Sequence, residues 1–164
     1  MRCKRTDKLL SFSALLGYRF NDLNLLKQAL THRSVPHASH NERLEFLGDA
    51  VLDLVISAQL FQLYSGCTEG ELTRMRSNLV ERAGLLCTAQ QWQMAPLLHV
   101  SRGERGGDGT PRASSVVANA VEAVIGAIYI DGGYEAAATV VLSAWGERIV
   151  GANKQPEVDA KTAL

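Results

Sequence analysis

The sequence predicts an all-α domain, on three observations. Of its 164 residues, 46% are hydrophobic but only 6% are aromatic, and Leu, Ala and Val dominate, which suits the packing of helices. Apolar residues recur at helical spacing over long stretches, most clearly in residues 41–56 and 114–127. No convincing alternation typical of strands and no internal repeat is found. A chain of this length can bury one hydrophobic core.

The first two helices are bounded by residues that start or stop helices. Residues 7–16 form the first, and Gly17 ends it. Asn21 is expected to cap the second, because its side chain can accept a hydrogen bond from a free backbone N–H. This helix runs to about Thr31, since Pro36 and the residue before it disfavour a continuation. The segment that follows is a loop.

A long helix is predicted from about Glu42 to Tyr64. Its acids Glu42, Glu45 and Asp49 lie three and four residues apart, so they share one face. Like charges at this spacing destabilise a helix, so we expect this face to hold a cation; a solvated acidic face is the alternative. Gly48 within the helix costs about 1 kcal/mol relative to Ala. It therefore indicates a close approach of another helix.

The structure of the next segments is predicted from their polar residues. Thr68 and Glu71 fit a capping box, which starts a helix that reaches about Glu81. A further helix runs to about Gln91. Residues 101–112 are rich in glycine and charge and are predicted to form a mobile loop.

The stretch 114–127 is almost wholly apolar, so its helix should be buried, and residues 131–133 end it. A last helix covers about residues 135–150. We find no stretch of about 18 apolar residues, so no membrane span is expected.

Two polar residues share a face of the buried helix, Asn119 and Glu122. A lone buried charge is expensive, so Glu122 needs a partner. The acidic face of the long helix, with a hard divalent cation between, would satisfy it. An ion pair with an arginine such as Arg43 or Arg76 is the alternative.

The charge and the cysteine content of the chain limit which functions are compatible with the sequence. Lys and Arg together equal Asp and Glu, 17 each, and the pI is near 6.9. Domains that bind nucleic acid are usually basic, so such binding would need a local basic surface or another domain. Cys3, Cys67 and Cys87 show no metal or redox spacing. An odd count without a signal peptide indicates free thiols in a reducing, cytoplasmic setting.

Residues 41–49 read Asn-Glu-Arg-Leu-Glu-Phe-Leu-Gly-Asp and resemble the signature of ribonuclease III, the endonuclease family that cuts double-stranded RNA. Further blocks resemble this family at residues 16–20, 25–26, 29–34, 68–76 and 121–127. Together they cover roughly residues 9–150. Several ordered motifs are far more specific than one.

The resemblance implies the ribonuclease III endonuclease-domain fold over residues 1–150, as a homodimer. It implies a Mg²⁺-dependent endoribonuclease that cleaves double-stranded RNA in the processing of ribosomal or messenger RNA, with Mn²⁺ as a substitute metal. Residues 151–164 resemble a linker and the start of a double-stranded-RNA-binding domain. The alternative function is a catalytically weakened ribonuclease III fold that serves as an RNA-binding or assembly module.

The family's metal ligands map onto Glu45, Asp49, position 119 and Glu122. We therefore expect Glu45, Asp49 and Glu122 to be catalytic. The family has an acid at position 119, whereas this chain has Asn119. Three ligand carboxylates instead of four predict less efficient catalysis and leave the fold unaffected.

The resemblance places Glu42 and Glu69 in the cleft, in supporting roles. Asp53 follows Asp49 by four residues but lies outside the matched motif, so we interpret it as an ordinary polar position. His32 is interpreted as a structural hydrogen-bonding residue rather than a base.

Arginines are the candidates for RNA binding, because their planar fork suits phosphate. Arg74 and Arg76 lie two residues apart on a helix and so point to different sides. One is expected to reach RNA while the other supports the carboxylates. Arg102, Arg105 and Arg112 in the loop are expected to contact the RNA backbone; a solvated loop is an equal alternative. Recognition should use A-form shape rather than base sequence.

Phe46 follows Glu45 and falls off the apolar stripe of its helix, so a simple helix would expose it. An exposed aromatic residue beside a metal site indicates an interface. In the family this position helps to hold a homodimer whose cleft carries two active sites. Burial of Phe46 within its own subunit is the alternative.

Overall fold

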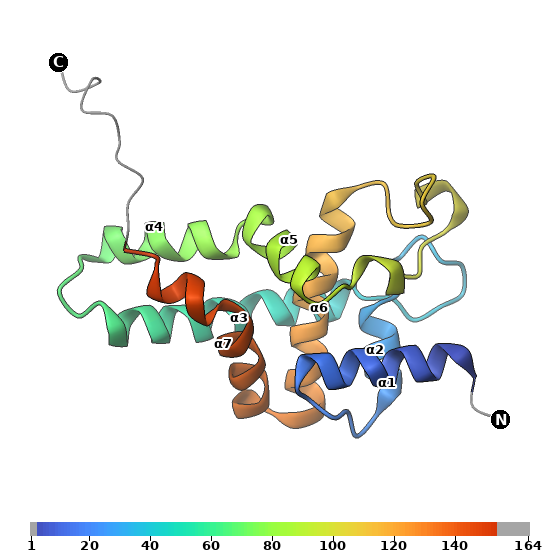
Figure 1. Cartoon of the computed structure of the whole chain (residues 1–164), viewed down its shortest axis with the longest axis horizontal. Helices are drawn as coiled ribbons and strands as arrows, with labels where there is room; N and C mark the ends of the chain where they lie inside the picture. Colours follow the sequence, from blue (N-terminus) through green and yellow to red (C-terminus); the bar gives the residue numbers. More distant parts are fainter. Residues whose placement is uncertain (1–2, 154–164) are drawn as a thin grey trace, which may run out of the picture.

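The computed structural model describes residues 3–153, which form a bundle of seven α-helices (Figure 1). These are α1 (Lys4–Leu16), α2 (Leu23–Ala29), α3 (Glu42–Leu63), α4 (Glu69–Val80), α5 (Arg82–Gln91), α6 (Ser114–Gly132) and α7 (Tyr134–Val150). Two 3₁₀ turns, η1 (Ala95–Leu97) and η2 (Arg102–Glu104), lie between α5 and α6. The all-α prediction is confirmed. Most of the predicted linker, and the start of a further domain, lie outside the described residues.

Helices α3 and α6 cross at the centre of the bundle (Figure 1). A glycine of each helix lies at the crossing. A Cβ atom on Gly48 would overlap the carbonyl oxygen of Glu122 and lie 2.9 Å from the Gly126 nitrogen. A Cβ atom on Gly126 would overlap the carbonyl oxygen of Leu44. The predicted close approach at Gly48 is therefore confirmed, and it sets Glu122 against the acidic face of α3.

The remaining helices surround this crossing, with α2, α5 and α7 against α6 and with α4 and α7 against α3. Trp145 of α7 is fully buried, and its indole N–H donates to the Leu79 carbonyl oxygen at 2.9 Å. Its ring meets Trp92 edge to face, with centroids 6.5 Å apart. These contacts fix α7 against the ends of α4 and α5, so the crossing is enclosed on several sides.

The helix α6 departs from one prediction. By length and composition alone it could cross a membrane, although no such stretch was expected from the sequence. Of its most apolar 18-residue window, 56% is buried inside the domain. Here α6 is the central core helix, and its apolar character is accounted for by this packing.

The two predicted N-terminal caps have different outcomes. The predicted capping box is present, since the Thr68 N–H donates to the Glu71 carboxylate at 2.8 Å and the Glu71 N–H donates to the Thr68 hydroxyl. At α2, Asp22 rather than Asn21 is the cap. The predicted cap is wrong because Asp131, from the end of α6, accepts the backbone N–H of Asn21 at 2.7 Å.

The segment 101–112 is a loop, as the sequence predicted, and it has a hairpin-like shape. An isolated bridge pairs Arg105 with Pro111, and the Gly106 N–H donates to the Thr110 carbonyl oxygen at 2.8 Å. The Arg112 guanidinium donates to the Arg105 carbonyl oxygen at 2.6 Å. These bonds give the loop a defined shape.

Candidate active site

Four carboxylates meet at the α3–α6 crossing. Glu45, Asp49 and Asp53 follow one another at intervals of four residues along α3, and Glu122 faces them from α6. The pKa of Glu122 is raised to about 8, first by burial and then by the charges of Asp49, Glu45 and Asp53. Glu122 therefore tends to hold a proton near neutral pH unless a cation offsets its neighbours.

The pKa of Glu45 is also raised, to a smaller degree than that of Glu122. Burial raises its pKa, and the charges of Glu42 and Asp49 raise it further, while Arg33 lowers it. Repulsion of this kind is what the sequence predicted for the acidic face of α3.

Asp53 belongs to the cluster, so its interpretation as an ordinary polar position is wrong. Burial and the charge of Asp49 raise its pKa, and Arg76 lowers it. Its Oδ1 atom is buried and has no hydrogen-bond partner among the described residues. A buried carboxylate oxygen without a partner is costly. The signal was visible in the sequence, because Asp53 lies one further helical turn beyond Asp49.

Among the described residues, no arginine forms an ion pair with Glu122. Within residues 3–153 the only ion pair closer than 4.0 Å joins Arg33 to Glu42, at 3.2 Å. The Arg76 guanidinium instead donates to the Ser57 hydroxyl at 2.9 Å. The alternative of an ion pair between Glu122 and an arginine is therefore wrong, and the cluster remains short of positive charge.

A polar cavity of about 610 Å³ opens beside this cluster. Its walls are His32, Arg33, Ser34, Asn41, Glu42, Glu45, Glu104, Ala113, Ser115, Val116 and Asn119. The cavity thus joins Glu42, Glu45 and Asn119, three of the predicted site residues. Asp49 and Glu122 lie one helical turn further along α3 and α6.

His32 lies in the wall of the cavity, and its Nδ1 atom is hydrogen-bonded to the Ser34 hydroxyl at 2.8 Å. The same hydroxyl accepts the backbone N–H of Ser101 at 3.0 Å. This network ties the loop after α2 to the segment before the hairpin. It agrees with the structural role predicted for His32.

The donor set suits a hard divalent cation, since such ions take carboxylate and amide oxygens. The unpartnered Asp53 oxygen and the raised pKa of Glu122 both indicate missing positive charge. Within residues 3–153, however, no group of three or more Asp, Glu, His or Cys side chains is arranged to hold a metal ion as it stands. Carboxylates close enough to shift one another's pKa would still have to turn towards a common centre.

Glu69 lies apart from the other predicted acids of the cleft. It lines a separate groove of about 240 Å³ between α3 and α4, together with Phe61, Leu72 and Arg76. Within one chain the structure therefore does not bring Glu69 to the cavity that contains Glu42.

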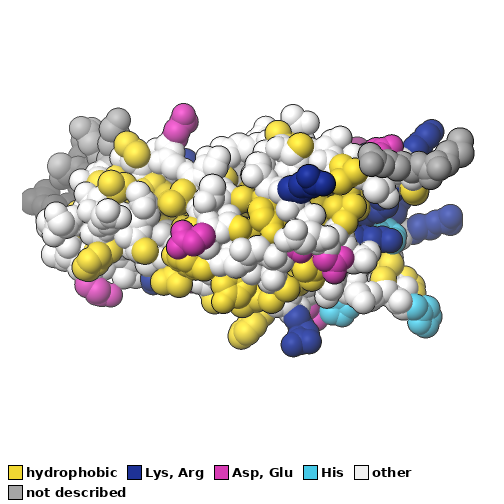
Figure 2. All heavy atoms as spheres, turned by 90° about the horizontal axis from the view of Figure 1, so that it is seen from below, with side chains coloured by type: hydrophobic (Ala, Val, Ile, Leu, Met, Phe, Trp, Pro, Cys, Tyr) yellow, Lys and Arg dark blue, Asp and Glu magenta, His cyan; other side chains and the backbone are white. Residues whose placement is uncertain are grey.

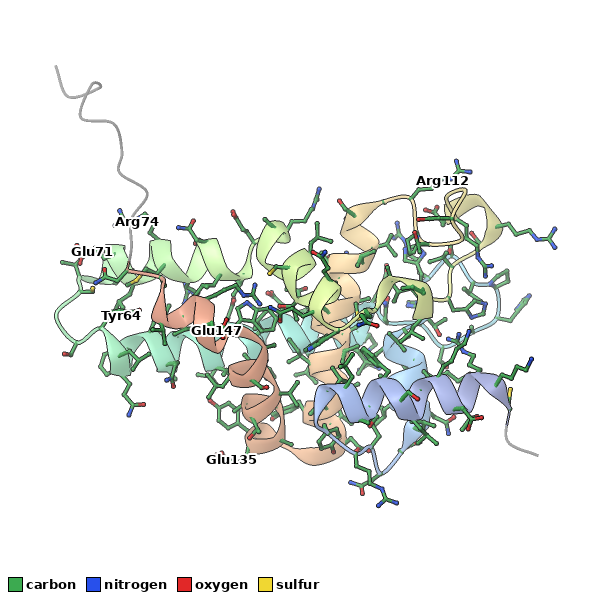
Figure 3. All side chains as sticks on the ribbon, viewed as in Figure 1. Tyr64, Glu71, Arg74, Arg112, Glu135 and Glu147 are labelled. Carbon is green, nitrogen blue, oxygen red and sulfur yellow. The ribbon has the colours of Figure 1, made fainter. Side chains whose placement is uncertain are left out.

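The predicted RNA-binding arginines form two groups. Arg74 is exposed on α4, and Figure 3 places it at the opposite end of the molecule from Arg112. Arg102 and Arg105 belong to the hairpin that also contains Arg112. Arg76 points back towards α3, which agrees with the prediction that one arginine of its pair supports the carboxylates.

Phe46 is 83% exposed, so the predicted exposure is confirmed and its burial within the subunit is wrong. Leu54 and Phe61, further along the helix, are 56% and 75% exposed. We call these three residues the α3 stripe. A row of large exposed apolar side chains on one helix indicates an interaction surface.

Comparison with known proteins gives consistent matches. The family described as Ribonuclease-III-like matches residues 22–148. Ribonuclease 3 of Bordetella avium (strain 197N) is 46% identical over 159 residues, a match that covers 95% of this chain and 62% of that protein. Ribonuclease 3 of Shewanella sp. (strain W3-18-1) is 46% identical over 152 residues, covering 91% and 66%. The chain thus spans less than two thirds of the length of these curated relatives.

Two solved structures have a similar fold. The nuclease domain of ribonuclease III from Campylobacter jejuni, in which a region involved in dimer formation shows flexibility, has a TM-score of 0.78 and 38% identity. That match covers 84% of this chain and 95% of the other. Dicer from Pichia stipitis has a TM-score of 0.61 and 25% identity, covering 80% of this chain and 57% of the other.

Proposed function

The chain belongs to the ribonuclease III family, and from this premise we propose that it is a Mg²⁺-dependent endoribonuclease that cleaves double-stranded RNA. In this proposal it acts in RNA processing, such as that of ribosomal or messenger RNA, in the cytoplasm.

The observation that carries the proposal is the position of Glu122. The close crossing of α3 and α6 at Gly48 and Gly126 places the Glu122 side chain beside three carboxylates of α3. Burial and these charges raise its pKa to about 8. Carboxylates with perturbed pKa values beside a cavity indicate a functional site. A divalent cation is the partner that relieves the repulsion among them.

The chain's own residues would act as follows. Glu45, Asp49 and Glu122 would supply charged oxygens to the ion, and Asn119 would supply a neutral one from the cavity wall. When bound, Mg²⁺ would activate a water molecule and stabilise the leaving oxygen of the phosphodiester. Asp53 would lie one helical turn beyond Asp49 on α3, where the charge of Arg76 partly offsets its own.

The α3 stripe would form the interface of a homodimer. In a two-fold interface the same surface of each copy faces the other, so Phe46, Leu54 and Phe61 would be covered together. Aromatic residues are common anchors of such interfaces. The 164-residue chain is expected to dimerise through this face.

The same symmetry would give Glu69 its supporting role. If the two α3 helices pack in opposite directions, the Phe61 end of one copy lies near the Phe46 end of the other. Glu69 lines the groove beside Phe61, whereas Glu45 adjoins Phe46. Glu69 would then approach the site of the partner copy rather than that of its own chain.

A catalytically weakened RNA-binding or assembly module is the second candidate, and Asn119 is the observation that favours it. An amide oxygen binds Mg²⁺ less strongly than a carboxylate does. In this case the chain would bind duplex RNA and dimerise but not cut.

The test is a cleavage assay on a long RNA duplex and on a single strand of the same sequence, with and without Mg²⁺. We expect cleavage of the duplex only, and only with Mg²⁺. Binding without cleavage at any metal concentration would favour the second candidate. Absence of both binding and cleavage would refute both.

A further inference from the structure

The acidic face of α3 continues one helical turn beyond the part that resembles the family signature. Glu45, Asp49 and Asp53 follow one another at intervals of four residues, so they share a face of the helix. We call these three residues the acidic row. The signature ends at Asp49, so Asp53 is not one of the metal ligands that the resemblance implies.

Asn119 and Asp53 lie at different ends of the carboxylate cluster. Asn119 lines the cavity together with Glu45, whereas Asp53 lies two helical turns beyond Glu45 on α3. After burial, the charge of Asp49 raises the pKa of Glu122 most, followed by those of Glu45 and Asp53. Glu122 therefore faces the middle of the acidic row. At the cavity end the family's acid is replaced by an amide, and at the other end this chain has an acid outside the motif.

The Asp53 carboxylate has an oxygen that the fold leaves without a partner. Its Oδ1 atom is buried and takes part in no hydrogen bond within residues 3–153. Arg76 lies within electrostatic range, but its guanidinium donates to the Ser57 hydroxyl at 2.9 Å, one helical turn beyond Asp53. A buried carboxylate oxygen without a partner lowers the stability of the fold. This oxygen is therefore available to an added cation.

Positive charge is scarce opposite Glu122. Besides burial, the charges that raise the pKa of Glu122 are those of the acidic row. Arg33 lies within electrostatic range of Glu45, but its guanidinium pairs with Glu42 at 3.2 Å. On the face that Figure 2 shows, most Lys and Arg side chains gather at one end of the molecule, on the right, whereas α3 and α6 cross at the centre of the bundle. The cluster thus needs a cation from solution.

We propose that Asp53 supplies the fourth negative charge of the Mg²⁺ site, in place of the acid that the family has at position 119. The proposal rests on the proposed function, since it concerns the same ion. Asp53 is in this sense a positioning residue, which draws the ion along the acidic row, away from the cavity wall. The affinity of a site for a hard cation depends on the number of charged oxygens around it. The charge of Asp53 would therefore offset much of the loss at Asn119.

The experiment moves one charge between the two positions. Asp53→Asn removes the charge, and the double variant Asp53→Asn, Asn119→Asp restores the total at the position where the family has it. Aspartate and asparagine are nearly isosteric, so the packing is kept, which circular dichroism verifies. Isothermal titration calorimetry with Mg²⁺ and with Mn²⁺, in the absence of RNA, measures the affinity of the parent chain and of each variant.

We expect Asp53→Asn to weaken binding of both metals by about 10-fold, because one of four charges is lost. The double variant should regain the affinity of the parent to within about 3-fold. Asn119→Asp should therefore increase affinity more in the Asp53→Asn background than in the parent. An equal increase in both backgrounds would show that the two positions do not share a site, and would overturn the proposal.

Melting temperatures separate this role from a structural one. Without divalent metal, Asp53→Asn should melt no lower than the parent, because the substitution removes a buried charge that has no partner. On addition of Mg²⁺ the melting temperature of the variant should rise less than that of the parent, since a more weakly bound ion stabilises the fold less. A lower melting temperature without metal, with the parent's rise on adding Mg²⁺, would mean that Asp53 has only a structural role.

Glu135→Gln is the matched control, because it also removes one negative charge. Glu135, labelled in Figure 3, is exposed on α7, and its side chain makes no hydrogen bond or ion pair among residues 3–153. This variant should keep the metal affinity of the parent and its rise in melting temperature. An equal loss in Glu135→Gln and Asp53→Asn would show an effect of net charge alone and would contradict the proposal.

The failures of the two proposals can be told apart. A parent chain that binds no divalent cation and does not cut duplex RNA refutes the proposed function and this inference together. A parent that cuts the duplex with Mg²⁺, with an Asp53→Asn variant of the same metal affinity, overturns the inference alone. A parent that binds Mg²⁺ without cutting, and binds it more weakly after Asp53→Asn, supports the inference and refutes the proposed nuclease activity.

Discussion

The carboxyl group of Glu122 links the stability of the protein to pH. Its pKa is raised from 4.5 to about 8 in the folded chain, mainly by burial. The protonated form therefore favours folding, and this contribution is complete below about pH 4.5 and is lost as the pH rises towards 8. Without divalent metal, the melting temperature should decrease over this range.

Thermal melts at several pH values measure this effect. Glu122→Gln, which remains neutral, should remove part of the decrease. Glu147 on α7, labelled in Figure 3, is exposed, and Glu147→Gln should leave the decrease unchanged. An identical decrease in the Glu122→Gln variant would mean that Glu122 is not the responsible group.

The side chain of Asn119 should limit the use of Mg²⁺. Hard cations favour charged oxygen donors, so Asn119→Asp is expected to raise the cleavage rate at low Mg²⁺ by about 10-fold, or about 1.4 kcal/mol. High Mg²⁺ or Mn²⁺ should narrow the difference. A metal titration of cleavage for both forms provides the test. Superimposable curves would show that the charge at position 119 has no effect.

At the residue scale, spacing along a helix predicted much of the site. The shared face of Glu45 and Asp49, and the need of Glu122 for a partner, were both readable from the sequence. Asp53 was missed because the motif ends at Asp49, although the four-residue spacing continues. The wall residues of the cavity, such as Glu104, come from distant segments, and no local pattern places them.

The α3–α6 crossing should depend on its glycines. Gly126→Ala would bring a methyl group onto the Leu44 carbonyl oxygen, so the helices must separate. We expect a loss of about 1–3 kcal/mol in the free energy of unfolding, and loss of cleavage because Glu122 moves away from α3. Chemical denaturation measures the stability.

Gly146→Ala on α7 is the matched control for this prediction. A Cβ atom there would meet nothing within 4 Å, so this change should stabilise the helix by about 0.5–1 kcal/mol. If Gly126→Ala behaved in the same way, a close crossing would not be present in solution.

At the element scale, local signals predicted the existence of the helices better than their ends. The Thr68 capping box and Gly17 gave correct ends, because these residues act on their own backbone. The start of α2 was misplaced because Asp131 comes from a distant helix. The hairpin at 101–112 depends on bonds between its two sides, which composition does not reveal.

Dimerisation is the prediction that belongs to the whole molecule. Phe46→Ala should weaken the dimer by about 2 kcal/mol or more, since truncation of an interface anchor often costs this much. Cleavage should fall with it. Leu15→Ala, an exposed apolar residue of α1, is the control. A parent chain that is monomeric in analytical ultracentrifugation would contradict this prediction.

The net charge of the whole molecule is counted directly from the sequence, whereas the distribution of charge depends on the fold. Equal numbers of acids and bases do not reveal that the carboxylates cluster at one place while Arg5, Lys27 and Arg105 lie near His99. Only the fold brings Arg5 and Arg105 to His99, because they come from separate segments of the chain. Net charge alone therefore does not reveal whether the surface carries a local basic region.

The most direct test of the central claim is Mg²⁺-dependent cleavage of a long RNA duplex by the parent chain and by Glu122→Gln. Loss of one charged oxygen at the crossing should reduce the rate by about 100-fold or more, while helical content and duplex binding stay the same. Full activity of Glu122→Gln, or parent cleavage that needs no divalent metal, would contradict a metal site built from these carboxylates.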